Sequence, residues 1–412
     1  MTQESSARAQ RQPGRGVGDA IRNWWGGLSR PAQWGIGVPA IIVLALIPLF
    51  PPPVLNTPGT SFGGVMAQFA MYALLAVGLN VVVGQSGLLD LGYVGFYAVG
   101  AYTIGVLTSP NSPWNQVRAG GAFDAEWAWL ACVPIAILIT AVSGLILGSP
   151  TLRLRGDYLA IVTLGFGEIV RLMADNLGDI TNGSLGLSGI AYPRLGESGT
   201  HAGGYFSAGN FGDSHSLNPL DRANSGTWWF WIGMVLVILV LLLVGNLERS
   251  RAGRAWVAIR EDEDVAEMMG VPTFKFKLLA FTIGAAIGGL SGALYAGQVQ
   301  FINPTGFNVI NSMLFLVAVV LGGQGNKLGV IVGAFLIVYL PNRFMSVNVA
   351  GQSLGDFKYL FFGITLVVVM IFRPQGLFPV RQKLLAYGRQ VYKVVRRPIP
   401  APMPAEATGV SR

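Results

Sequence analysis

Long apolar runs, separated by short polar segments, dominate the pattern of this sequence. A helix needs roughly 20 apolar residues to cross the hydrocarbon core of a membrane. Several runs are short or rich in glycine, so one or two of them are expected to be re-entrant rather than spanning. The pattern therefore predicts an all-α, polytopic membrane helix bundle of about eight to ten transmembrane or re-entrant helices. The candidate runs lie near 34–50, 62–83, 88–108, 127–148, 157–174, 227–246, 277–297, 309–322, 327–341 and 358–372.

Positive charge divides the intervening polar segments into two sets, as the positive-inside rule expects of a membrane protein. If the N-terminus is cytoplasmic, only five of the 28 Lys and Arg residues lie in external loops: Arg118, Arg194, Arg222, Arg343 and Lys358. This skew predicts that both termini are cytoplasmic. The predicted parts are an N-terminal tail (1–33), a transmembrane domain (34–380) and a basic, Pro-rich tail (381–412). Within the domain, 175–226 is predicted to be an external loop and 247–276 a cytoplasmic loop.

Two of these segments admit a second interpretation. The first apolar run could be a signal peptide, but the polar stretch 1–33 precedes it and no A-x-A cleavage site follows. We therefore expect a retained helix. The external loop is too long for a simple turn, and it is either a folded cap that docks a partner or a mobile, solvated loop.

Composition supports the membrane class and excludes several others. The chain is 12% charged and 52% hydrophobic, whereas a soluble domain is about 25% charged. The net charge of +8 is explained by basic cytoplasmic segments that contact lipid headgroups, so no nucleic-acid partner is expected. Cys132 is interpreted as a small buried hydrophobe. His201 and His215 stand alone in a polar loop, and no metal site is predicted.

Two enzyme motifs are absent from the sequence. It contains no GxxxxGK[ST] loop, so the chain is not expected to bind ATP in the P-loop manner or to act as an enzyme by itself. It also contains no HExxH helix. No cofactor is therefore assigned to this chain.

The stretch 253–271, GRAWVAIREDEDVAEMMGV, departs from this apolar background because seven of its nineteen residues are charged. The pattern predicts one or two short helices in which Val265, Met268 and Met269 share one apolar face. Gly270 and Pro272 supply a stop. A short amphipathic helix of this kind suits a groove on a soluble partner, and the alternative is a solvated connecting loop. We favour docking for Arg254, Glu261, Asp262, Glu263, Asp264, Val265, Ala266, Glu267, Met268, Met269 and Gly270.

Small residues recur every four positions in the run 277–297. Gly284, Gly288 and Gly292 would form a smooth helix face that a neighbouring backbone can approach closely. The face is interpreted as a packing surface, and a helix that slides against its partner is the alternative.

Polar residues inside the apolar runs are candidates for a translocation path, because such residues are costly in lipid. Asn80, Gln85, Ser86 and Asp90 surround the break Gly84-Gln85-Ser86-Gly87, and Tyr93 and Tyr97 follow at near-helical spacing. Internal packing and anchoring at the membrane interface are the alternatives for the tyrosines. Glu168 and Arg171 lie three residues apart on one helical face, where they form either a structural ion pair or a substrate contact.

Four longer stretches resemble one family: 78–107, 152–173, 253–271 and 319–341, together with the ending RPQGLFP at 373–379. They resemble the LivM-type permease subunit of bacterial high-affinity branched-chain amino-acid ABC importers. The segment 264–270 resembles the EAA coupling motif of such permeases, with Asp and Val in place of Glu and Ala. The likeness runs from about 67 to 379; the first 33 residues and the tail after 396 lie outside it.

The resemblance implies a subunit of an ATP-driven importer of Leu, Ile or Val in the bacterial plasma membrane. Its expected partners are a second permease subunit, two cytoplasmic ATPase subunits that bind ATP and Mg²⁺, and an external substrate-binding protein. Urea, short amides and other amino acids are alternative solutes. An ion-coupled secondary transporter is the alternative from another class.

Overall fold

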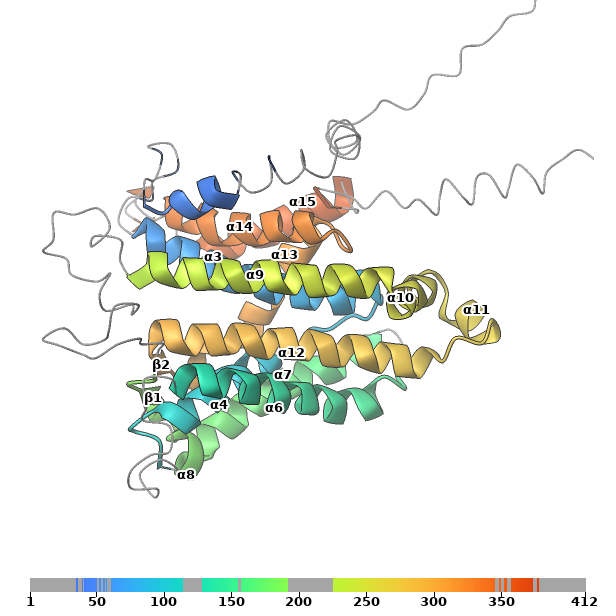
Figure 1. Cartoon of the computed structure of the whole chain (residues 1–412), viewed down its shortest axis with the longest axis horizontal. Coiled ribbons are helices and arrows are strands. Elements are labelled where there is room, and N and C mark those ends of the chain that lie inside the picture. The colour runs from blue at the N-terminus through green and yellow to red at the C-terminus, as the bar shows by residue number, and fades with distance from the viewer. Residues whose placement is uncertain are drawn as a thin grey trace, which may run out of the picture.

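The computed structural model describes residues 61–113, 128–154, 157–191 and 225–344, with parts of 35–57 and 348–377. In this part of the chain most of the long helices lie side by side along one direction, and strands β1 and β2 lie at the opposite end from helices α10 and α11 (Figure 1). The predicted tails 1–33 and 381–412, and most of the predicted external loop, fall outside the described residues.

Each apolar run predicted beyond residue 60 overlaps one long helix of the structure. This agreement confirms the all-α membrane bundle. The helices are α3 (Phe62–Leu79), α4 (Val94–Thr108), α6 (Ala128–Thr151), α7 (Asp157–Asn176), α9 (Ser225–Arg249), α12 (Thr273–Val299), α13 (Val309–Gly322), α14 (Lys327–Phe344) and α15 (Lys358–Phe372). A π-helical turn, η1 (Asn80–Gln85), continues α3.

Helix α3 forms the centre of the bundle. In the most apolar stretch of α3 and η1, 89% of the residues are buried, against 22% in α6 and in α9. Helices α9, α12 and α14 pack around α3, and α6 packs against α12. The exposed apolar side chains of α6 and α9, such as Ile146 and Leu242, therefore form the surface that would meet lipid or another subunit.

Small residues allow α12 to lie against its neighbours at backbone distance. A Cβ atom added at Gly292 would lie 2.1 Å from the carbonyl oxygen of Tyr97 on α4. One added at Gly284 would lie 2.4 Å from a side-chain carbon of Val82 on η1, and one at Gly288 would lie 3.2 Å from Cβ of Phe96. The predicted small-residue face is thus a close-packed contact with α4 and η1.

Some helices of the described bundle are too short to cross a membrane alone. Helices α4 and α13 have 15 and 14 residues, which span about 21–23 Å against a hydrocarbon core of about 30 Å. Their N-terminal ends meet at Ser312, whose hydroxyl donates to the carbonyl of Leu91 (2.6 Å) and accepts from the amide of Val94 (3.4 Å). The chain therefore breaks its helices inside the bundle, as solute transporters commonly do.

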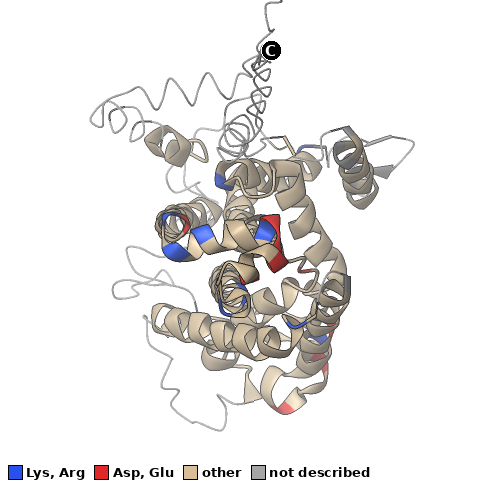
Figure 2. Cartoon of the chain, turned by 90° about the vertical axis from the view of Figure 1, so that its right-hand side faces the viewer, with Lys and Arg blue, Asp and Glu red and all other residues tan. Residues whose placement is uncertain are grey.

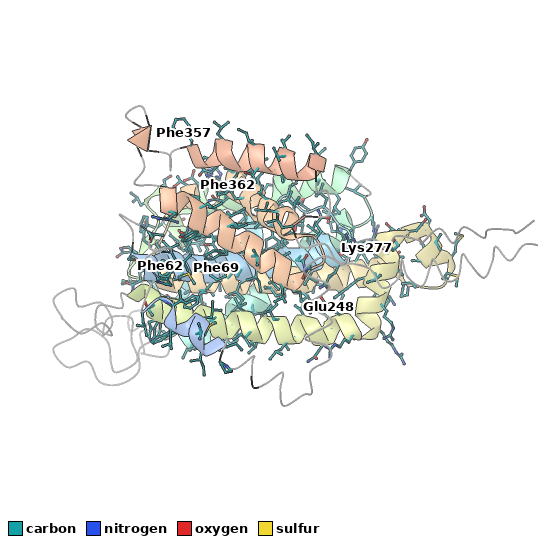
Figure 3. The ribbon with its side chains drawn as sticks, turned by 90° about the horizontal axis from the view of Figure 1, so that it is seen from above. Phe62, Phe69, Glu248, Lys277, Phe357 and Phe362 are labelled. Carbon is teal, nitrogen blue, oxygen red and sulfur yellow. The ribbon has the colours of Figure 1, made fainter. Side chains whose placement is uncertain are left out.

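The two ends of the bundle differ in structure. At one end, β1 (Leu187–Ser188) pairs antiparallel with β2 (Phe301–Ile302), and α8 (Gly178–Thr181) and η2 (Gly183–Leu185) lie beside them. Two further strands, β3 (Asn348–Val349) and β4 (Gln352–Ser353), pair with each other, and η4 (Pro304–Gly306) leads to α13. The other end carries α10 (Arg251–Glu261) and α11 (Glu263–Met268). Phe62 and Glu248 lie toward these opposite ends (Figure 3).

Candidate functional site

Residues 251–270 form a protruding segment that we call the hook. Its first helix, α10, begins at Ser250, whose hydroxyl accepts from the amide of Ala252 (3.1 Å). One face of α10, which includes Trp256 and Ile259, is buried against the bundle. The indole of Trp256 donates to the carbonyl of Phe276 (2.7 Å). This contact ties α10 to the first turn of α12.

The second helix of the hook, α11, projects away from the bundle. Asp262 caps it by accepting from the amide of Val265 (3.0 Å), and acidic residues favour a helix N-terminus. Gly270 ends it with a φ of 83°, a left-handed conformation that suits glycine. Only Ala266 of α11 is buried, whereas Met268 and Met269 are 78% and 80% exposed. The hook thus presents two methionines to its surroundings.

Charged residues gather on the hook end of the molecule (Figure 2). Glu263 at the start of α11 forms an ion pair with Lys277 on α12. The Lys277 side chain is only 5% exposed, so its positive charge depends on this partner. The sequence interpretation placed Glu263 in the acidic surface of the hook. The structure also engages it in an ion pair that holds α11 to α12, and its role in docking stays a prediction.

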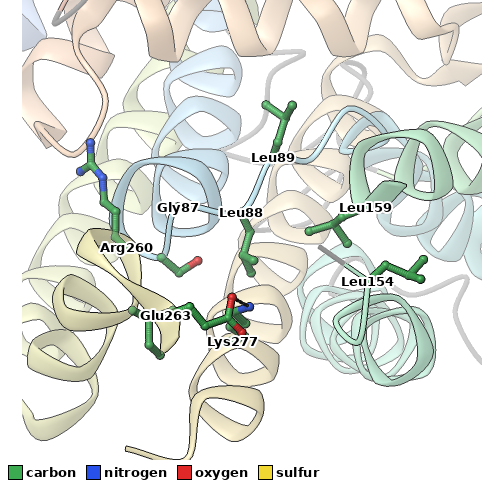
Figure 4. A pocket seen from close by; sticks show the side chains of 10 residues that line it. Gly87, Leu88, Leu89, Leu154, Leu159, Arg260, Glu263 and Lys277 are labelled. Atoms are coloured by element: carbon green, nitrogen blue, oxygen red, sulfur yellow. Dashed lines mark ion pairs between the residues drawn. The ribbon is translucent and has the colours of Figure 1, made fainter. Parts of the chain in front are cut away.

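A small cavity of about 220 Å³ lies between the hook and the break after α3. Its lining includes the loop from Ser86 to Leu89, Leu154, Leu159, Ile259, Arg260, Glu263 and Lys277 (Figure 4). Arg260 also donates to the carbonyl of Gly84 in η1. The hook therefore contacts the broken helix as well as α12.

Glu248, near the end of α9, joins two other elements at the same end. One of its carboxylate oxygens accepts from the side-chain amide (Nε2) of Gln85 and the other pairs with Lys327 of α14, each at 2.5 Å. The side-chain oxygen of Asn80 accepts from the amide of Gly325 (2.7 Å). These bonds hold η1, α9 and the turn before α14 together.

The candidate path residues fall into two groups. Asn80, Gln85, Ser86 and Asp90 are all buried around the break. Among the described residues, one polar atom of each of Asn80, Gln85 and Asp90 has no hydrogen-bond partner. Glu168 lies apart from this group, on α7, where it forms an ion pair with Arg171.

The two candidate tyrosines lie in packed contacts within the subunit. The hydroxyl of Tyr93 donates to the carbonyl of Gly284 (2.6 Å), which ties the start of α4 to α12. The ring of Tyr97 contacts those of Tyr295, Phe307 and Phe315. Both side chains therefore contribute to the packing of α4.

Sequence reasoning missed the residues that connect the hook to the bundle. Trp256, Arg260 and Lys277 hold it to α12 and η1, and Glu248 and Lys327 join the neighbouring helix ends. All of them except Trp256 share one signal, which is charge near a helix end in a chain that is only 12% charged. Their pairing could not be read from spacing, because the partners are far apart in the chain.

The architecture defines a class of protein. Four of the described helices are long and apolar enough to cross a membrane, and broken helices and buried polar groups lie between them. These features are those of a multi-pass membrane transport protein.

Comparison with known proteins then identifies the family. Residues 61–370 match the family model for the permease component of the branched-chain amino acid transport system, and the chain belongs to this family. It is 41% identical over 319 residues to the high-affinity branched-chain amino acid transport system permease protein LivM of Salmonella typhimurium, covering 76% of this chain and 69% of that protein. The identity and coverage are the same for LivM of Escherichia coli.

A second type of permease in the same transport system is also related. The chain is 26% identical over 308 residues to the permease protein LivH of Salmonella typhimurium, covering 74% of this chain and 90% of that protein. No solved structure matches the chain. As a member of a permease family, the chain is a transport component rather than an enzyme.

Proposed function

We propose that this chain is one of two different permease subunits that together import leucine, isoleucine or valine across the bacterial plasma membrane. Two ATPase subunits on the cytoplasmic side would bind ATP and Mg²⁺, and an external binding protein would deliver the amino acid. This chain itself would bind no cofactor. The similarity to LivM carries the proposal, and the related LivH sequence supports a homologous second subunit.

The hook is the proposed docking element for the ATPases. Exposed methionines adapt to a groove on a partner because their side chains are flexible and apolar. Met268 and Met269 are 78% and 80% exposed at the end of the short helix α11, which the ion pair of Glu263 with Lys277 ties to α12. The hook would then face the cytoplasm, as the distribution of positive charge predicts, and both termini would lie on the same side.

The contacts of the hook suggest how ATPase movement reaches the membrane. When ATP closes the ATPase pair, the hook would move with it. The movement would pass through Trp256 and Glu263 to α12, and through Arg260 to η1. The bundle would open outward to receive the amino acid, and hydrolysis would reset it.

Other solutes and other energy sources are less well supported. If the solute were urea, a short amide or another amino acid, this chain would differ from the LivM proteins in the solute that it transports. An ion-coupled transporter would need no docking hook. In vesicles that hold ATP inside, leucine uptake should persist when an uncoupler collapses the ion gradients.

The docking assignment is tested by a double variant, Met268→Ser with Met269→Ser, in the complete transporter. Loss of an interface anchor typically costs at least about 1–2 kcal/mol, so we expect roughly a tenfold or greater loss of ATPase co-purification and of leucine uptake. The permease should still insert. Leu185→Ser is the matched control, because Leu185 is 79% exposed at the opposite end of the bundle. Full co-purification with undiminished uptake would reject the assignment.

A further inference from the structure

Helix α7 differs from the other long helices of the described bundle in its charge. It carries Asp157, Glu168, Arg171 and Asp175 within 20 residues, and it is not among the helices apolar enough to cross a membrane by composition. The Nε atom of Arg171 donates to an oxygen of Glu168 (2.9 Å), and Nη2 donates to the same oxygen. Their side chains are 24% and 36% exposed. An ion pair therefore stands on the surface of the subunit.

This pair lies well inside the helix. Glu168 is 11 residues from Asp157 and 8 from Asn176, which places it about 12–16 Å from either end. In the same part of α7, Thr163 accepts from the amide of Leu91 (3.1 Å). The helix thus packs one face against the break that precedes α4, at the depth where α4 and α13 meet.

The opposite face of α7 is open. A Cβ atom added at Gly165 would have no neighbour within 4 Å. Ile161, Ile169 and Leu172 are 65%, 57% and 43% exposed. Glu168 and Arg171 therefore stand among aliphatic side chains, beside an open position at Gly165.

Contact with lipid would be energetically unfavourable for this face of α7. A charged side chain at the centre of a membrane helix costs at least about 2.5–3.5 kcal/mol, and such residues nearly always face protein or a water-filled path. The face must accordingly border another subunit, water or both. Among the described residues, Glu168 and Arg171 form hydrogen bonds only with each other, so the second carboxylate oxygen and one guanidinium nitrogen remain available.

We propose that the open face of α7 lines the path between the two permease subunits, where Glu168 binds the ammonium and Arg171 the carboxylate of the amino acid in transit. The proposal rests on the proposed function. The Glu168–Arg171 pair has no net charge, and neither has a zwitterionic amino acid. When the amino acid binds, the ion pair between Glu168 and Arg171 is replaced by two ion pairs, one with the ammonium and one with the carboxylate of the amino acid. Ile169, Leu172 and the space over Gly165 suit a branched aliphatic side chain. Such a site can bind and release its solute, as a transport path requires.

The test places a single cysteine at the open position. Gly165→Cys is combined with Cys132→Ala in the complete transporter, reconstituted in vesicles with its binding protein and ATP. We expect a charged, water-soluble thiol reagent to label Cys at this position, and millimolar L-leucine to slow the labelling several-fold. Gly363→Cys on α15 is the control, because Gly363 is equally open on a helix with exposed apolar neighbours. It should be labelled slowly and without protection.

A second variant tests the role of the charges. Adding Glu168→Gln should keep the labelling of the 165 position but remove protection by leucine, and it should lower leucine uptake tenfold or more. A merely structural ion pair would change the amount of inserted complex and leave protection intact. Absence of labelling, or protection that survives Glu168→Gln, would overturn the inference. Failure of the unmodified transporter to take up leucine would instead overturn the proposed function.

Discussion

Helices α11 and α12 follow each other closely in the chain but are held in opposite ways. More than half of the residues of α12 are buried, and its glycines meet the backbone of α4 and the side chains of η1. Only Ala266 of α11 is buried, and most of the helix projects from the bundle (Figure 1). One helix is part of a rigid core, and the other is a projection from it.

This difference indicates that a partner could apply force to the hook and that α12 would transmit the resulting movement to the bundle. Close packing makes α12 resist local deformation, so a pull on the hook would move the helix as a unit. The hook is joined to the bundle by the buried face of α10 and by a few polar contacts, which include the indole of Trp256 and the pairs Glu263–Lys277 and Arg260–Gly84. Substitutions in α12 should therefore damage assembly, whereas those in the hook should damage coupling.

The largest effect is expected from Gly292→Val. Its Cβ would lie 2.1 Å from the carbonyl oxygen of Tyr97 and 2.8 Å from the amide of Ala101, and backbone atoms cannot rotate away. Overpacking typically costs about 1–3 kcal/mol and occasionally more, and here we expect the upper end. Little monodisperse complex should be recovered in detergent, and leucine uptake should fall to background.

Two further glycine variants calibrate this result. Gly288→Leu should have a smaller effect, because its nearest neighbours are side chains at 3.2–3.3 Å. Gly363→Val, at an open position, should assemble normally. Recovery of Gly292→Val at the level of Gly363→Val would show that α12 is not closely packed.

The sequence predicts the helices of this fold well, because each is a local pattern of apolar residues. The run predicted at 309–322 coincides with α13, and the three glycines of α12 lie at the expected close contacts. The hook helices also follow from local signals, since Asp262 caps α11 and Gly270 ends it.

The contacts between these elements could not be predicted. Lys277 appeared as the first residue of an apolar run, although its charge is buried against Glu263. Glu248 pairs with Lys327, 79 residues further along the chain. Nor does any local pattern indicate that α4 and α13 meet at Ser312. Such pairings depend on how the helices pack, which a single sequence does not specify.

A smaller effect is expected from Glu263→Gln. This change leaves the Lys277 ammonium, on a side chain that is 5% exposed, without its anion. Loss of a charged hydrogen-bond partner costs about 1–3 kcal/mol. The unfolding temperature and the leucine uptake should both fall while the complex still assembles.

The double variant Glu263→Gln with Lys277→Met separates stability from coupling. It leaves no unpaired buried charge, so the unfolding temperature should recover. Uptake should stay low because α11 is no longer tied to α12. Unchanged uptake in both variants would mean that this pair does not transmit the movement of the hook.

Docking of cytoplasmic ATPases on the hook requires that the hook lie on the cytoplasmic side of the membrane. Met269→Cys, with Cys132→Ala, would be treated with a membrane-impermeant thiol reagent in intact cells and in inside-out vesicles. Leu185→Cys at the opposite end serves as the reciprocal control. If the hook faces the cytoplasm, the 269 position is labelled only in inside-out vesicles and the 185 position only in intact cells. Labelling of the 269 position in intact cells would contradict it.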